Sequence, residues 1–246
     1  MNKLPAITLS FWIMKICATT MGETAGDLLS MTLHVGYGLS SAMLLSFFFA
    51  TLVVQLSTKK FHPIIYWAVI LATSTAGTTM SDFMDRTLGL GYATGSLILI
   101  SLLITTLLLW KASEKSLSVT NIQSLRGEIF YWAAILFSNT LGTALGDFLA
   151  DDSGLGFAGG ALLIGSLLAG ISLAFYFTKI SRVILFWLAF VLTRPFGATF
   201  GDLLTKTREK GGLNFGTTGS SLILFSVLAV LIAISMIKLK RQPSAA

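Results

Sequence analysis

Acidic residues recur at one fixed place along the chain. In each of four segments an aspartate lies 15 residues after a tryptophan, with a glycine and a small residue between them. The four aspartates are Asp27, Asp82, Asp147 and Asp202. Carboxylate oxygens are the hard ligands that Mg²⁺, Mn²⁺ and Ca²⁺ prefer. Four such residues brought together could therefore bind a metal cation.

Three further charged residues interrupt otherwise apolar stretches. Glu23 comes four residues before Asp27, while Lys15 and Arg194 lie in the first and fourth of the same segments. A charge inside an apolar helix is costly and usually faces a partner or a water-filled cavity. Two interpretations are open. Glu23 and Arg194 form a structural ion pair if the first and fourth segments adjoin, or Glu23 binds cargo or a proton and Arg194 or Lys15 displaces it.

The residue types favour oxygen ligands and argue against catalysis. The single cysteine, Cys17, has no partner for a disulfide, and the two histidines, His34 and His62, lie in loops or at loop edges. The sequence offers no nucleophile–base pair, histidine-rich metal motif or phosphate-binding loop, so we expect no enzyme activity. The candidate metal ligands are Glu23, Asp27, Asp82, Asp147 and Asp202. We expect no cofactor beyond a bound divalent cation.

The composition places these residues in a membrane. Of the 246 residues, 54% are hydrophobic and 11% are charged, and the mean hydropathy is +0.81. A soluble domain carries roughly a quarter charged residues, so the composition excludes a water-soluble globule and intrinsic disorder. The apolar residues fall in eight stretches, each long enough to cross a bilayer core of roughly 30 Å as a helix. We expect an all-α protein in contact with the lipid bilayer, and no nucleic-acid partner despite the net charge of +6.

Four repeats organise the eight stretches. They align on Trp12, Trp67, Trp132 and Trp187, each with a glycine ten residues later. After each aspartate, a glycine-rich turn leads to an aromatic residue and a second apolar stretch, which indicates one two-helix unit used four times. The chain resembles a bacterial family of membrane-anchored proteins catalogued as a repeat of unknown function, and the resemblance covers essentially the whole chain. It implies a multi-pass protein of the bacterial inner membrane with eight spans, and it carries no activity.

The spacing of the repeats predicts two four-helix halves joined by a polar cytoplasmic linker. The predicted ranges are 1–110 for the first half, with repeats 1–57 and 58–110, 111–128 for the linker, and 129–246 for the second half, with repeats 129–180 and 181–246. Because each repeat holds two spans, all four repeats enter the membrane in the same direction. The fold class is therefore eight transmembrane helices in four parallel two-helix repeats, with the halves related by a pseudo-twofold axis along the membrane normal.

Lysine and arginine set the expected orientation. Eleven of them lie in the termini and the loops between repeats, and four lie in the opposite loops. Cytoplasmic loops carry the excess of positive charge, so we expect both termini in the cytoplasm. The tryptophans then lie near the cytoplasmic interface, where indoles anchor helices. Fifteen residues of helix put the aspartates roughly 22 Å away, near the outer face.

Polar residues form one stripe along the first helix of each repeat. At about 100° per residue, positions 7, 11, 14 and 15 after the tryptophan share one face. Position 7 holds Thr19, Ser74, Asn139 and Arg194, and Lys15 lies at the edge of the stripe. We expect the stripe to line an ion path. Its small and hydroxyl residues could instead make helix contacts, and the aspartates could only cap the turns that follow them.

These features favour a secondary transporter or exporter of a small inorganic cation, with a divalent metal such as manganese as the preferred cargo. Clustered carboxylates could also couple transport to protons, because each charge disfavours ionisation of its neighbours. Two alternatives remain open. One is a pseudo-fourfold cation channel, in which Lys15 and Arg194 would be badly placed, and the other is a transporter of a small organic cation.

Overall fold

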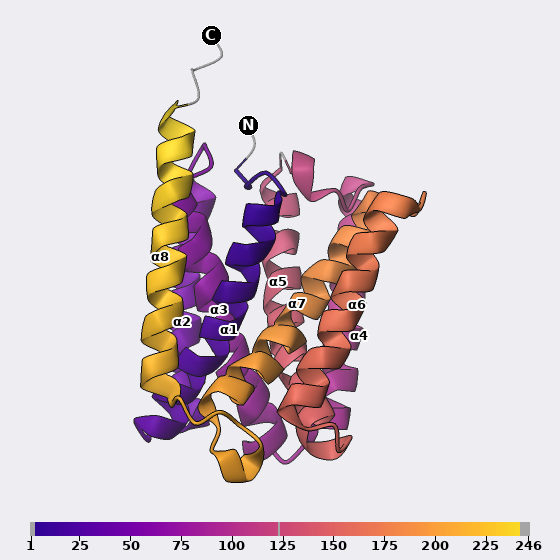
Figure 1. Cartoon of the computed structure of the whole chain (residues 1–246). Coiled ribbons are helices and arrows are strands. Elements are labelled where there is room, and N and C mark those ends of the chain that lie inside the picture. Colours follow the sequence, from indigo (N-terminus) through magenta and orange to yellow (C-terminus); the bar gives the residue numbers. More distant parts are fainter. Residues whose placement is uncertain (1–2, 123, 242–246) are drawn as a thin grey trace.

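Eight long helices build the structure. The computed structural model describes residues 3–122 and 124–241, which form helices and connecting loops with no strand. The predicted end repeats and linker also include residues 1–2, 123 and 242–246, which lie outside this description. The helices are α1 (Leu9–Asp27), α2 (Tyr37–Ser57), α3 (Pro63–Asp82), α4 (Tyr92–Glu114), α5 (Leu125–Asp147), α6 (Gly156–Phe177), α7 (Arg182–Thr205) and α8 (Thr217–Arg241). They lie side by side, and both ends of the described chain are at the same end of the bundle (Figure 1).

Short turns complete the secondary structure. Three inner helices continue directly into π-helical turns, and two 3₁₀ turns lie in loops. These are η1 (Leu28–Thr32), η2 (Phe83–Thr87), η3 (Val119–Asn121), η4 (Phe148–Asp152) and η5 (Arg208–Lys210). The π-helical turns lie at the end of the bundle opposite the chain ends (Figure 1).

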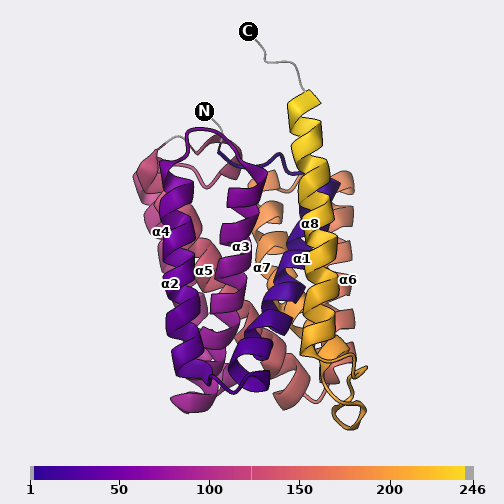
Figure 2. The ribbon, with the colours of Figure 1, turned by 90° about the vertical axis from the view of Figure 1, so that its left-hand side faces the viewer.

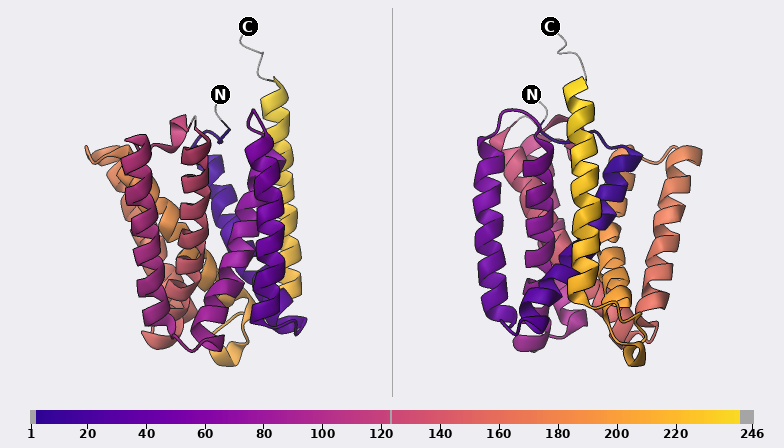
Figure 3. Two further views of the ribbon diagram at one scale, coloured as in Figure 1. Left: turned by 180° about the vertical axis from the view of Figure 1, so that it is seen from behind. Right: turned by 60° about the vertical axis from the view of Figure 1, so that its left-hand side comes forward.

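The odd-numbered helices form a closed inner ring. α1 contacts α3, α3 contacts α5, α5 contacts α7, and α7 contacts α1. The even-numbered helices pack outside: α2 on α3, α4 on α5, α6 on α7 and α8 on α1 (Figures 2 and 3). In α3, 72% of the residues in the most apolar stretch are buried inside the protein, whereas the share in α8 is 6%. The outer helices therefore present most of their apolar side chains outward, as lipid contact requires.

Seven helices, α2 to α8, are long and apolar enough to cross a membrane. This all-helical architecture supports a multi-pass membrane protein. α1 lies below that hydropathy because it carries Lys15, Glu23 and Asp27. Its polar residues are tolerated because α3, α7 and α8 pack around it and little of it needs to face lipid.

Glycines bring the inner helices into close contact. The glycine ten residues after each tryptophan packs against position 7 of the next inner helix: Gly22 against Ser74, Gly77 against Asn139, Gly142 against Arg194 and Gly197 against Thr19. A β-carbon at Gly77 would lie 3.0 Å from backbone atoms of Asn139 and Thr140. Small residues allow such approach between membrane helices. The prediction that the glycines serve helix contacts is therefore confirmed.

Enlarging one of these glycines tests the ring contact. We expect Gly77→Ala to destabilise the protein by about 1–3 kcal/mol, because the added methyl group overpacks a contact between two backbones. Gly170→Ala in α6 is the matched control, since no atom lies within 4 Å of the β-carbon it would add. The measurement is the unfolding midpoint of each purified variant in detergent. Equal midpoints for the two variants would contradict the close-contact interpretation.

The tryptophan end of the ring is filled with aromatic side chains. Trp67, Trp132 and Trp187 are buried inside the protein. The Tyr66 and Tyr131 hydroxyls share a hydrogen bond of 2.7 Å, with both side chains fully buried. The expectation that these indoles anchor at the lipid interface is therefore wrong for these three. The outer helices and the segment before α5 enclose the inner ring, so its tryptophans meet protein instead of lipid.

Candidate cation site

The four repeated aspartates end the inner helices. Asp27, Asp82 and Asp147 are the last residues of α1, α3 and α5, and Asp202 lies in the last turn of α7. All four are buried. The first three begin π-helical turns, yet none of their side chains makes a capping hydrogen bond. The capping interpretation is therefore wrong for these three, and their carboxylates are available for other contacts.

Arg86 joins two of the aspartates. Its Nε lies 2.8 Å from Asp82 Oδ1, and its Nη2 lies 3.2 Å from Asp147 Oδ2. The guanidinium carbon also lies 5.6 Å from the centre of the Tyr92 ring. One planar cation thus links the end of α3 to the end of α5. Its side chain is 34% exposed, which places it at the rim of the bundle.

Lys206 joins the other two aspartates. Its Nζ lies 2.5 Å from Asp27 Oδ2 and 3.0 Å from Asp202 Oδ1, and its side chain is 19% exposed. Burial acts to lower the pKa of Lys206, but the carboxylates of Asp202 and Asp27 outweigh it and raise the pKa above the ordinary lysine value. The ammonium group therefore remains charged at neutral pH and links α7 to α1.

Arg86 and Lys206 are site residues that were not predicted from the sequence. Arg86 and Lys206 each follow the aspartate of their repeat by four residues, the spacing at which side chains meet on a helix. Repeats one and three carry Met31 and Asp151 at the same position. This alternation was the available signal, and it divides the four aspartates into two bridged pairs.

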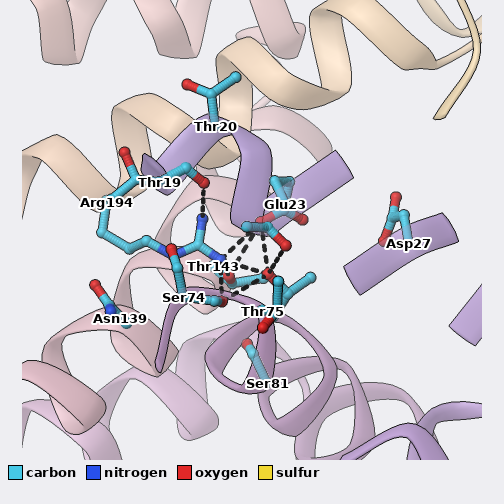
Figure 4. Close-up of polar contacts among 12 residues, drawn as sticks. Thr19, Thr20, Glu23, Asp27, Ser74, Thr75, Ser81, Asn139, Thr143 and Arg194 are labelled. Atoms are coloured by element: carbon cyan, nitrogen blue, oxygen red, sulfur yellow. Dashed lines mark hydrogen bonds and ion pairs between the residues drawn. The ribbon is translucent and has the colours of Figure 1, made fainter. Parts of the chain in front are cut away.

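Glu23 and Arg194 meet inside the ring, and Asp27 lies apart from them (Figure 4). Glu23 Oε2 lies 3.0 Å from Arg194 Nη2, and the side chains are 3% and 0% exposed. The hydroxyls of Thr78 and Thr143 donate to Glu23 Oε2 at 3.3 and 3.2 Å. Arg194 Nη2 in turn lies within hydrogen-bond distance of both hydroxyls. The predicted ion pair is confirmed, because α1 and α7 adjoin.

Two of the other position-7 residues, Thr19 and Ser74, hold the arginine in place. Arg194 Nη1 donates to the Thr19 carbonyl and Nη2 to the Ser74 carbonyl, both at 3.3 Å. The Thr19 hydroxyl donates to the carbonyls of Ile16 and Thr193. These residues therefore contribute backbone oxygens to a buried cation. Their role in an ion path stays a prediction.

Lys15 lies at a separate level, nearer the aromatic end. Its Nζ donates to Asn139 Oδ1 at 3.4 Å and lies 3.9 Å from the centre of the Phe190 ring. Asn139 is itself held by a second hydrogen bond, in which its Nδ2 donates to Thr73 Oγ1 at 2.9 Å. Within the described residues, no carboxylate lies within 4 Å of Lys15 Nζ. The structure thus separates Lys15 from the acidic groups.

Three of the five predicted metal ligands converge. One carboxylate oxygen from each of Glu23, Asp147 and Asp202 lies within 4.8 Å of the other two. Asp27 and Asp82 are not in this group. In every one of the five carboxylates a basic group pairs with one oxygen, while the other accepts no hydrogen bond from the described residues. Each of the five carboxylates is thus already in contact with one basic group.

The repeats match a known family along most of the chain. Residues 10–61, 65–116, 130–181 and 185–239 each match the model described as Repeat of Unknown Function (DUF347). The chain belongs to this family. Each matched segment of this DUF347 protein holds one inner and one outer helix, so the prediction of four tandem two-helix repeats is confirmed. No curated protein and no solved structure matches the chain.

Proposed function

We propose that this DUF347 protein is a membrane transporter of a small cation, with a divalent metal such as Mn²⁺ as the preferred cargo. The cargo binds to Glu23, Asp147 and Asp202. The observation that carries the proposal is the convergence of these three buried carboxylates, contributed by three different inner helices, within 4.8 Å. Carboxylate oxygens at such separations suit a hard cation.

The charge of the site supports a divalent cargo. Five carboxylates are in contact with three basic groups, Arg86, Arg194 and Lys206, which leaves an excess of two negative charges. Uncompensated charge is costly inside a protein and more so at membrane depth. A bound divalent cation would remove this excess.

The proposal includes eight membrane spans. α1 crosses the membrane as one of the four inner helices, and the two halves are related by a pseudo-twofold axis along the membrane normal. The excess of lysine and arginine at the chain ends puts that end in the cytoplasm. The carboxylates then lie near the outer face.

Two features favour a carrier of inorganic ions over the alternatives. Tyr66 and Tyr131, with their aromatic neighbours, fill the ring at the end opposite the aspartates, which suits a carrier better than an open pore. An organic cation needs a larger space than the carboxylate triangle. A cavity of about 510 Å³ lies at the end of the bundle where the chain ends are, beside Trp12 and Phe186, and no carboxylate lines it.

Metal flux into proteoliposomes tests the function. We expect the purified wild-type protein to move Mn²⁺, and Asp147→Asn to abolish this flux while the protein stays folded, since Arg86 keeps Asp82 as a partner. Asp152→Asn is the matched control: it removes the same charge from an exposed residue of η4. Mg²⁺, Ca²⁺ and Na⁺ are compared in the same assay.

Each result has a distinct meaning. Folded wild-type protein that moves none of these ions would contradict the proposed function. Equal flux by Asp147→Asn and the wild type would contradict the site. A high flux that persists without a proton gradient would favour the channel.

A further inference from the structure

The loop after α7 folds back on the C-terminal end of its own helix. In repeat four the aspartate and the aromatic residue of the turn are 13 residues apart, against 10 in each of the other repeats. The extra length closes on the helix: Leu213 N donates to Leu203 O at 2.7 Å, and Asn214 N donates to Lys206 O at 3.0 Å. The insertion thus holds the backbone of Lys206 at the rim of the site.

Lys206 places a positive charge where cargo would approach. Its ammonium group lies between Asp27 and Asp202, carboxylates of two different helices. Asp202 is also one of the three converging ligands. Lys206 and a bound cation therefore share the carboxylate of Asp202, and this one negative charge cannot fully neutralise both cations at once. The partial exposure of the lysine puts it on the outer side of that carboxylate.

The equivalent bridge made by Arg86 is of a different kind. The planar guanidinium contacts two carboxylates through different nitrogens and also lies over the Tyr92 ring. A lysine ammonium is a point charge on a flexible four-carbon chain, with no comparable stacking. The Lys206 bridge therefore depends on its two ion pairs alone among the described residues.

We infer that Lys206 is a tethered competitor of the cargo and that the loop after α7 is the outer gate of the site. Cargo binds to Asp202 only after the ammonium group has moved away from Asp202 and Asp27. The inference rests on the proposed function and names the residue that sets its cation affinity.

Binding of Mn²⁺ to the purified full-length protein, measured by calorimetry, tests the gate. We expect Lys206→Gln to bind Mn²⁺ about tenfold more tightly than the wild type. In the wild type, Lys206 occupies Asp202 and Asp27 most of the time, so only a small fraction of the protein is free to bind the metal, and the apparent affinity is lower by that fraction. Lys210→Gln is the matched control. Lys210 lies in the same loop and carries the same charge, but it is exposed and pairs with no carboxylate among the described residues. It should leave the affinity close to that of the wild type.

A charge-conserving variant covers the case in which Lys206→Gln fails to fold. A β-carbon at Gly212 would overlap the backbone of Lys206, so Gly212→Ala must displace the loop while keeping the lysine. We expect Gly212→Ala also to bind Mn²⁺ more tightly, by a smaller factor. Folded variants that bind with the wild-type affinity, or more weakly, would overturn the gate and leave the proposed function standing. Wild-type protein that binds no Mn²⁺ would overturn the proposed function itself.

Discussion

Arg194→Gln is expected to lower the free energy of unfolding by about 3–5 kcal/mol, the cost of leaving one buried charge of an ion pair without its partner. Glu23 would remain inside the ring with only the hydroxyls of Thr78 and Thr143 as donors. Two neutral hydroxyls cannot replace a guanidinium that also contacts two backbone carbonyls. The measurement is the unfolding of purified protein in detergent by heat or denaturant.

A second substitution separates charge from packing. The double variant Arg194→Gln with Glu23→Gln contains two neutral amides in place of the ion pair, and we expect it to recover much of the lost stability. Arg208→Gln, on the exposed η5 turn, controls for the loss of one positive charge. A double variant no more stable than Arg194→Gln alone would mean that the unpaired carboxylate is not the cause.

The double variant Asp147→Asn with Asp202→Asn is expected to weaken Mn²⁺ binding by more than about a hundredfold. Each substitution removes one charged ligand and preserves its size, and an interaction with a charged group is worth about 1.5–3 kcal/mol. Two such losses correspond to a change in Kd of at least this magnitude. The fold should persist, because Arg86 keeps Asp82 and Lys206 keeps Asp27.

The matched control removes the same two charges from the same end of the bundle. Asp151→Asn with Asp152→Asn changes two exposed carboxylates of η4. If this control loses as much affinity as the site variant, the effect is the general negative field of the surface. If the site variant binds Mn²⁺ normally, the three converging carboxylates are not the metal site.

The repeats and the central ion pair could be predicted from the sequence. A constant spacing of 15 residues between tryptophan and aspartate can be seen without coordinates. Glu23 and Arg194 lie one helical turn apart in height on equivalent faces, so contact between the first and last repeats was sufficient to join them. Such arguments work because helix geometry fixes height and face.

The division of the aspartates could not be predicted in the same way. A fourfold pattern suggests four equal carboxylates around an axis. The structure instead joins Asp82 to Asp147 and Asp202 to Asp27, because only repeats two and four carry a basic residue four positions later. The prediction that the tryptophans anchor at the lipid interface was wrong for a related reason. Sequence gives the height of an indole along a helix, but not whether lipid or a neighbouring helix covers it.

The circular packing of the repeats has a consequence for biosynthesis. The outer helix of each repeat covers the inner helix of the following one, and α8, the last helix to be made, covers α1, the first. While the ribosome is still making repeat three, α1 has neither its cover nor the guanidinium that neutralises Glu23. We therefore expect α1 to complete its packing only after repeat four has been made.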